Sequence, residues 1–313
     1  MGEAVTIARP RMPQETMMPV ATAAGGLPDP ELTVLTEAEF ASMREEEGAR
    51  VVQHDGRYWE VVFPGFYQPI HWLARFKAAA VRRPAIFCWG YRAALDDQDA
   101  HLANGSIPVH LLTHVEQFTE SGLIESRRRD LRKCRREVEF RRVQDPSLLL
   151  EQGWGVFRSA QLRVPHGRPL TREDYQLRIE RRASDQRRVF VVGLIDERLA
   201  GYMEAYAVDG VLYTHELFVA TEFVRTGIGT GLYVETIEIG ARAGTIHEVC
   251  NGIHAPERPG IKAFKDTLGS RVVRVPARVA MPAPIGAYIK ARRPLTYYRL
   301  TGVEPAAAAA VQE

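Results

Sequence analysis

Cysteine is scarce in this chain of 313 residues, and no stretch of it stays apolar for long. The three cysteines, Cys88, Cys134 and Cys250, form no CxxC pair, and their odd number leaves one thiol over in any set of disulfides. This favours a reducing compartment, and nothing in the pattern indicates a metal site. No apolar run approaches the ~20 residues that cross a bilayer, and Pro19 interrupts a weakly hydrophobic N-terminal stretch. We therefore expect a cytoplasmic protein without a membrane partner.

The chain also lacks a large excess of charge of one sign, because it has 41 basic and 39 acidic side chains. A formal net charge of +2 does not by itself call for nucleic acid or a membrane. The composition is that of a globular protein, 45% hydrophobic and 26% charged, with room for one large or two modest domains. Only the ends depart from it, and residues 1–32 and 303–313 are expected to be a disordered arm and tail.

The front third, residues 33–122, has an α+β pattern. Thr36 and Glu39 form a capping-box pattern for a short helix, and Asp55-Gly56 is a favoured hairpin turn. The expected elements are a helix at 35–43, strands at 50–53 and 57–63, a helix at 71–80, and strands at 85–91 and 107–112. An aromatic group here could line a substrate pocket, although packing in the core is favoured: Phe63, Phe66, Tyr67, His71 and Trp72.

The remainder, residues 123–302, alternates strand and helix patterns. It is expected to contain a basic helix within 114–137, a strand at 138–143, helices at 146–162 and from 171, a hairpin at 189–195 and 199–207, a strand at 212–219, a helix from 232, a strand at 246–250, a helix at 261–268, and strands at 271–275 and 279–281. The fold class is therefore mixed α/β, with a mixed sheet. Between the helix at 146–162 and the helix from 171, His166 is interpreted as a loop histidine.

The run from Leu212 to Val219 is the most informative stretch. Its β-branched and aromatic residues predict a central strand, and strict alternation would place His215 and Glu216 on opposite faces. Gly227, Gly229 and Gly231 follow, and then a helix. Glycines at a strand-to-helix turn let backbone N–H groups approach a phosphate, although many such turns need glycine for steric reasons alone. Neither a GxGxxG fingerprint nor a Walker lysine is present.

Three motifs in this order resemble a known superfamily. Gly227, Gly229 and Leu232 are similar to the acyl-CoA pyrophosphate loop of the GNAT acyltransferases, although Val224 stands where Gln or Arg is usual. Gly260–Gly269, with Phe264, Lys265, Leu268 and Gly269, resembles the F-K-x-x-hydrophobic-G motif of the FemAB-like branch. Ser126–Val138 resembles the basic helix that precedes the acyltransferase half in that branch. The resemblance implies a GNAT-like core in residues 123–302 behind a smaller N-terminal half.

The resemblance also implies an acyl-CoA donor, most simply acetyl-CoA, and a set of site residues. Glu216 is the expected general base and His215 its competitor, while a purely structural ion pair for Glu216 stays open. Lys265 would contact a phosphate or the oxyanion, and Tyr233 could protonate the thiolate, although core packing is favoured for it. The donor would be held by Phe218, Val219, Arg225, Thr226, Gly227, Ile228, Gly229, Thr230 and Gly231.

Three functions fit these observations. The first is transfer of an acyl group from acyl-CoA to an amine of a small molecule or peptide. The second is a tRNA-dependent aminoacyl transfer, in which Arg127, Arg128 and Arg132 would bind the nucleic acid, unless they form only a solvated basic face. The third is a catalytically inactive fold that serves as a binding module.

Overall fold

The computed structural model describes residues 32–164 and 169–304. Residues 1–31 of the expected arm, residues 305–313 of the expected tail, and His166 lie outside these ranges. In the part of the chain that is described, no helix combines the length and the apolar character needed to cross a membrane.

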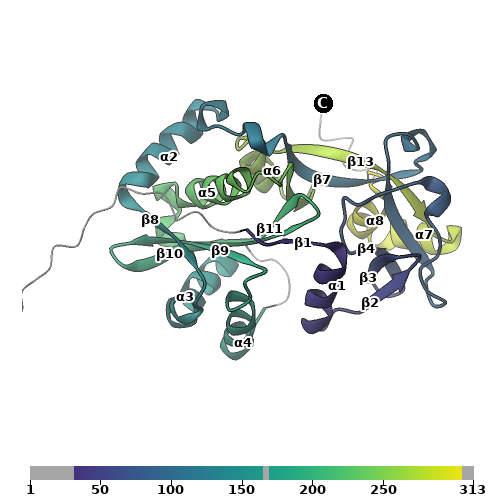
Figure 1. The fold of residues 1–313 in the computed structure, drawn as a ribbon, viewed down its shortest axis with the longest axis horizontal. Coiled ribbons are helices and arrows are strands. Elements are labelled where there is room, and N and C mark those ends of the chain that lie inside the picture. Colours follow the sequence, from purple (N-terminus) through teal and green to yellow (C-terminus); the bar gives the residue numbers. More distant parts are fainter. Residues whose placement is uncertain (1–31, 165–168, 305–313) are drawn as a thin grey trace, which may run out of the picture.

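One mixed sheet of 13 strands runs through the molecule (Figure 1). Its main path, in spatial order, is β2 (Val51–His54), β3 (Arg57–Phe63), β4 (Phe66–Pro69), β6 (Gly90–Leu95), β13 (Arg271–Ala280), β7 (Gly105–Thr113), β12 (Glu248–Ile253), β11 (Val211–Val219), β10 (Arg198–Val208), β9 (Val189–Ile195) and β8 (Glu139–Val143). Two short strands lie off this path: β1 (Val34–Leu35) pairs with β10, and β5 (Arg75–Phe76) pairs with β6.

Helices cover both faces of the β8–β12 part of the sheet. Figure 1 shows α2 (Glu125–Glu137), α5 (Ile228–Arg242) and α6 (Pro259–Asp266) above it, and α3 (Ser147–Arg163) and α4 (Arg172–Ala183) below it. The upper core packs Leu131, Ile228 and Leu232 against the strands, and the lower core packs Phe157, Tyr175 and Phe218. This is the layered arrangement expected for a mixed α/β protein.

Three further helices cover the rest of the molecule. Helix α1 (Glu37–Glu46) packs beside β2 and β3, and α7 (Ala283–Arg292) and α8 (Pro294–Thr301) lie at the β4–β6 end (Figure 1). The capping box of Thr36 and Glu39 is confirmed, since each residue's side chain accepts from the other's backbone N–H. The hairpin turn at Asp55-Gly56 is confirmed as well.

The predicted helix at 71–80 is wrong. This segment contains β5 and a single 3₁₀ turn at Ala78–Ala80, because Arg75 and Phe76 pair in parallel with β6. The predicted strand at 85–91 is also wrong, since the strand runs from Gly90 to Leu95 after a tight turn. In the first place pairing with β6 outweighs local helix propensity, and in the second the turn closed by the Cys88 N–H and the Ala85 carbonyl delays the start of β6.

Two further boundaries differ from prediction. The expected strands at 271–275 and 279–281 form the single strand β13, which is inserted between β6 and β7 and is paired on both edges at Ala277. The helix expected within 114–137 begins only at Glu125, because His114 adopts a left-handed conformation (φ 55°) and two 3₁₀ turns follow it.

Candidate active site

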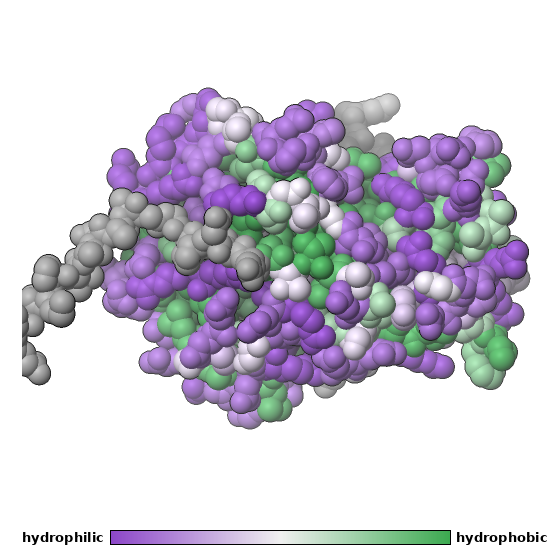
Figure 2. Space-filling model, viewed as in Figure 1, coloured by the Kyte–Doolittle hydropathy of each residue, from purple (hydrophilic) through white to green (hydrophobic). Residues whose placement is uncertain are grey.

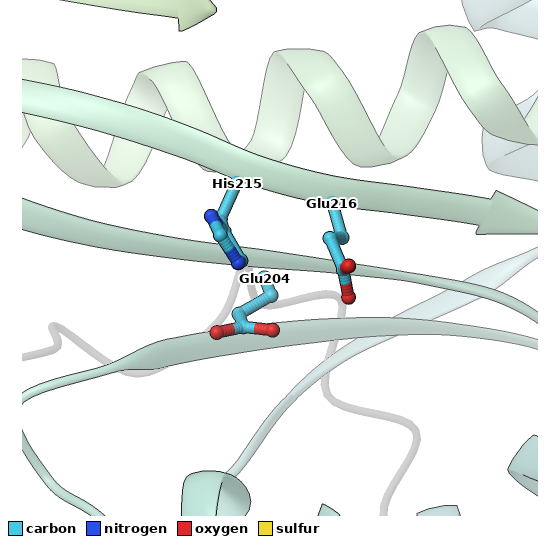
Figure 3. A group of neighbouring side chains, drawn as sticks. All are labelled: Glu204, His215 and Glu216. Atoms are coloured by element: carbon cyan, nitrogen blue, oxygen red, sulfur yellow. The ribbon is translucent and has the colours of Figure 1, made fainter. Parts of the chain in front are cut away.

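A β-bulge in the central strand β11 brings His215 and Glu216 to the same face of the sheet. Across the β10–β11 pair, Glu204 lies opposite Glu216 and Ala205 lies opposite Thr214, so His215 is the extra residue of the bulge. One carboxylate oxygen each of Glu204 and Glu216 and one ring nitrogen of His215 all lie within 4.8 Å of one another (Figure 3). The predicted placement of His215 and Glu216 on opposite faces is therefore wrong, because the bulge breaks the alternation on which it rested.

Glu216 is a partly buried carboxylate with one strong partner. Its side chain is 17% exposed, and its Oε2 atom accepts a hydrogen bond from the Arg178 guanidinium on α4. Burial raises the pKa of Glu216, and the neighbouring Arg178 opposes that rise. No hydrogen bond to its Oε1 atom comes from the described residues. Glu216 thus keeps one oxygen for a ligand while Arg178 holds the other.

His215 is open to solvent but is crowded by protein atoms in a concave site. Desolvation lowers its pKa to about 4, although the Glu204 carboxylate favours the protonated ring. Its ring also faces Tyr206, with ring centroids 5.8 Å apart. A group with this pKa is neutral near pH 7 and is a weak base there.

Glu204 belongs to a buried ionic network and not to the open site. It accepts hydrogen bonds from Arg188 and, at 3.2 Å, from Arg182, and Glu47 on the edge of α1 binds the same two arginines. Burial alone would raise the pKa of Glu204, but the His215 imidazole and the two guanidiniums lower it. The spacing of Glu204, His215 and Glu216 could hold a metal ion, yet arginines already bind both carboxylates, and this disfavours a further cation.

A cavity of about 410 Å³ opens where β11 and β12 separate. The two parallel strands pair only from Val211 to Tyr213 and from Glu248 to Cys250, and Gly252 (φ 80°) then turns β12 away. The walls of this acceptor cavity, as we call it, include Thr214, His215, Glu216, Leu217, Tyr233, Asn251, Arg258, Phe264 and Lys265.

Lys265 and Tyr233 reach the acceptor cavity through one polar network. The Lys265 ammonium donates to the backbone carbonyl of Asn251, and burial lowers its pKa to about 8. The Tyr233 hydroxyl lies 2.6 Å from the Ser270 hydroxyl and accepts from the Asn251 amide, and burial raises its pKa. Lys265 therefore titrates close to neutral pH, whereas Tyr233 holds its proton firmly.

A second cavity, of about 430 Å³, lies beside the glycine turn. We call it the donor cavity, and its walls are Arg127, Asp130, Arg163, Leu217, Val219, Val224, Arg225, Gly227, Gly229, Thr230 and Phe264. It shares Arg163, Leu217 and Phe264 with the acceptor cavity. The two cavities therefore meet at the end of β11.

The three glycines have different reasons to be glycine. Gly227 has φ 84°, and a Cβ there would lie 2.8 Å from the Asp130 carbonyl oxygen. At Gly231 a Cβ would lie 2.3 Å from the Phe140 ring, so packing excludes a side chain. Gly229 borders the donor cavity as Gly227 does, but a Cβ there would fit, since it would come no closer than 3.8 Å to Phe264 and Val219. Helix α5 begins at Ile228, four residues before the predicted start at Leu232, so Gly229 and Gly231 lie within its first turn.

The other expected donor-binding residues fall into two groups. Arg225 borders the donor cavity, as do Val219 and Thr230. In contrast, the Ile228 side chain is fully buried, and the Thr226 hydroxyl is used inside the turn, where it donates to the Phe223 carbonyl at 2.8 Å. These last two shape the turn from within.

Backbone N–H groups of β11 also point at the cavities. The Ala220 N–H donates to the Ala200 carbonyl at 3.0 Å, so the antiparallel ladder turns the Phe218 N–H toward β10. The same alternation turns the N–H groups of Leu217 and Val219 away from β10, toward the side on which β12 has separated. Of the two expected positions, Val219 is the one that presents its N–H to the cavities.

Two arginines of the site were not identified from the sequence. Arg163, near the end of α3, donates to the Val219 carbonyl at 2.9 Å and to the Thr221 hydroxyl at 2.8 Å, and it borders both cavities. Arg178, the partner of Glu216, was missed as well. Each is one of many arginines on helices, and no local pattern distinguishes it.

The three arginines expected to bind tRNA are not equivalent. Arg127 is turned inward, where it donates to the Thr267 hydroxyl at 2.8 Å and stacks over the Phe264 ring. Arg128 and Arg132 both pair with Glu125 on the outside of α2. Only the latter two belong to the outer surface, which Figure 2 shows as strongly hydrophilic over this helix.

Comparison with known proteins agrees with this geometry. Residues 156–269 match the model of the acetyltransferase (GNAT) family, and the chain has no match among curated proteins. The matched segment begins in the second half of α3 and includes the glycine turn and the Lys265 motif. The chain therefore contains an acetyltransferase domain of the GNAT family.

Solved structures share the fold of nearly the whole chain. The C-terminal domain of a putative lysylphosphatidylglycerol synthetase from Agrobacterium fabrum has a TM-score of 0.53 and 12% identity, covering 85% of this chain and 98% of that domain. L-PGS from Bacillus licheniformis has a TM-score of 0.53 and 12% identity, and the match covers 86% of this chain and 93% of that one. A conserved protein of unknown function from Bacteroides thetaiotaomicron has a TM-score of 0.53 and 9% identity, and the match covers 81% of this chain and 94% of that one. At these identities the likeness concerns the fold.

Proposed function

We propose that this GNAT acetyltransferase domain moves an acyl group from acyl-CoA, most simply acetyl-CoA, to an amine of a small molecule or peptide. The observation that carries the proposal is the meeting of two cavities at Leu217, Phe264 and Arg163. One cavity offers a socket for phosphate, and the other offers a carboxylate. A thioester bound in the first would present its carbonyl to an amine bound in the second.

The donor cavity has the features that a pyrophosphate needs. Gly229 has no side chain to cover the N-terminal turn of α5, its N–H has no partner among the described residues, and the helix dipole at this turn favours an anion. The side chains of Arg127 and Arg225 stand in the same wall and add positive charge. When bound, acyl-CoA supplies a thioester carbonyl that an amine can attack.

The N–H groups of Leu217 and Val219 are the proposed hydrogen-bond donors to the thioester carbonyl. They point toward the gap between β11 and β12, where both cavities meet. Negative charge develops on this oxygen as the amine nitrogen attacks, and fixed donors stabilise it without reorganising. Lys265, charged below a pH of about 8, adds a nearby cation.

Glu216 is the proposed general base. An amine enters largely as the ammonium ion and must lose a proton before its nitrogen can attack. The free Oε1 atom of Glu216 can take that proton, directly or through a water, and the raised pKa of Glu216 makes it a better acceptor. The C–N bond then forms and the C–S bond breaks. The attacking nitrogen loses its second proton, and the departing CoA thiolate takes up one proton, from that nitrogen or from solvent. His215, with a pKa of about 4, is the weaker candidate.

The decisive test is calorimetric titration of the full chain with acetyl-CoA and with longer acyl-CoAs, followed by an amine screen that detects released thiol. Saturable binding and amine-dependent thiol release are expected. If no acyl-CoA binds, acyl-CoA is not the donor.

A tRNA-dependent aminoacyl transfer is the second candidate, and the outer face of α2 favours it. Arg129 and Arg136 are exposed there and have no acidic partner among the described residues, next to Arg132 and Lys133. Such binding would weaken steeply with salt and with neutralisation of Arg128 and Arg132. A binding module would show ligand binding without turnover.

A further inference from the structure

Two neighbouring turns form an apolar tip at the end of the molecule away from the candidate active site. One turn is residues 63–66, and the other is residues 85–88, closed by the Cys88 N–H donating to the Ala85 carbonyl at 3.1 Å. Trp89 ties the turns together, since its backbone N–H donates to the Gly65 carbonyl at 3.0 Å and its indole N–H to the Pro64 carbonyl at 2.6 Å. The tip is therefore held in one conformation.

The two residues at the centre of the second turn are Ile86 and Phe87, each 83% exposed. Turn centres are usually glycine, proline, asparagine, aspartate or serine, so two large apolar residues in these places are unusual. Pro84 and Cys88 on either side are buried, so the chain is anchored while the tip projects. Figure 2 shows a hydrophobic protrusion at the lower right end of this view. Such exposure marks an interaction site.

Two of the chain segments at this end carry charge of one sign. Residues 61–95 and 267–303 contain twelve Arg and Lys residues and no Asp or Glu, in a chain whose formal net charge is only +2. The segments are neighbours, because β13 pairs with β6 and because Ile289 of α7 packs in one cluster with Phe66 and Trp89.

The exposed cations lie on the tip and on α7. Arg82 and Arg83 directly precede the tip, and α7 ends in exposed Lys290, Arg292 and Arg293 beside a Tyr288 that is 66% exposed. None of these five basic residues has an acidic partner among the described residues, whereas Arg274 and Arg299 pair with Glu304 and Glu257. The unneutralised charge thus lies directly before the apolar tip and at the end of α7, which packs against the Phe66 and Trp89 side of the same turns.

We propose that this end of the molecule docks on an anionic lipid bilayer, with Ile86 and Phe87 inserted among the acyl chains and the surrounding arginines and lysines bound to headgroups. A narrow apolar tip with a cationic border matches the bilayer interface, where apolar groups are buried while basic side chains stay with anionic headgroups. No spanning segment is needed for this mode of binding, so the expectation of no membrane partner, which rested on the lack of such a segment, does not exclude it.

The test is co-sedimentation of the full chain with vesicles of phosphatidylcholine alone or mixed with phosphatidylglycerol. We expect binding to the mixed vesicles that weakens at high salt, and little binding to phosphatidylcholine. Substituting Ile86→Ser with Phe87→Ser, or Arg82→Gln with Arg83→Gln, should each reduce the partition coefficient about tenfold or more. Because the tip is exposed, these variants should keep the wild-type melting temperature.

Matched controls lie elsewhere on the surface. Leu177→Ser removes an apolar side chain that is 67% exposed on α4, and Arg129→Gln with Arg136→Gln removes two exposed charges on α2, and neither change should alter the partition coefficient. Failure of the wild type to bind the mixed vesicles, or equal loss in tip and control variants, would overturn the proposal. So would a tip substitution that abolishes a dimer seen by light scattering without affecting lipid binding, since the tip would then join two copies.

Discussion

The Nδ1 atom of His254 lies 3.3 Å from the Nε2 atom of His110, and the two rings meet edge to face. His110 belongs to β7 and is 1% exposed, whereas His254 follows β12 and is 8% exposed. The contact works when one nitrogen carries a hydrogen and the other does not. A second proton would bring two positive rings together in a buried place.

This pair predicts a loss of stability in acid. Burial, together with the charges of Lys265 and His254, lowers the pKa of His110 to about 4, while an unfolded histidine titrates near 6.5. The unfolded chain therefore binds the extra proton first, and the stabilisation present above about pH 6.5 is lost as the pH falls toward 4. The contribution of His110 is at most about 3 kcal/mol. Urea unfolding at several pH values should show that the free energy of unfolding changes less steeply with pH in His110→Gln than in the wild type. An unchanged slope would contradict the assignment.

Replacing Glu216 by Gln should reduce turnover about 10²- to 10⁴-fold, because the amide cannot take a proton from the acceptor ammonium. Acetyl-CoA affinity should change little, since Glu216 does not border the donor cavity. Both quantities follow from thiol-release kinetics and calorimetry. Glu222→Gln, which alters an exposed carboxylate paired with Arg198, is the control. Wild-type turnover in the Glu216 variant would leave it only a structural partner of Arg178.

Substituting Gly229 by Leu should abolish the rise in melting temperature caused by acetyl-CoA, because the new side chain would fill the donor cavity. Gly155→Leu is the matched control, since Gly155 also lies in a helix, has open space around its Cα and borders neither site cavity. A full ligand-induced shift in the Gly229 variant would place the donor elsewhere.

Gly231→Ala should instead destabilise the protein itself, by about 1–3 kcal/mol, because the added methyl would overlap Phe140 and Cys134. Denaturant unfolding measures this directly. Acetyl-CoA affinity of the folded variant should stay close to that of the wild type. If Gly231→Ala left the free energy of unfolding unchanged, α2 and β8 would have to move apart at this contact at little energetic cost.

Lys265 predicts the alkaline limb of the pH–activity profile. With a pKa of about 8, its ammonium loses charge as the pH rises through 8, and stabilisation of the oxyanion is lost with it. Activity should rise as Glu216 ionises and fall above about pH 8. In Lys265→Arg the fall should move to higher pH, since a guanidinium stays charged. An unmoved limb in that variant would assign it to another group.

The sequence predicted most of the elements around the site but not how their side chains meet. Periodicity and turn residues located β9, β10, β11 and α3 within a residue or two, because these elements follow their own propensities. The bulge at His215 could not be predicted, since it depends on the register between β10 and β11. The role of Arg178 depends on the packing of α4 below that bulge. The same holds for β5, which is a strand only through its pairing with β6, and for the continuity of β13, which pairs with both β6 and β7.

The position of β13 has a consequence for synthesis of the chain. Strands β6 and β7 do not pair with each other, and residues 271–280 fill the space between them. Until these late residues leave the ribosome, the nascent protein must carry two open strand edges, which are sites for pairing with other chains. Premature termination before residue 271 should therefore yield an aggregation-prone product, and chaperones should bind the growing chain until its last strand arrives.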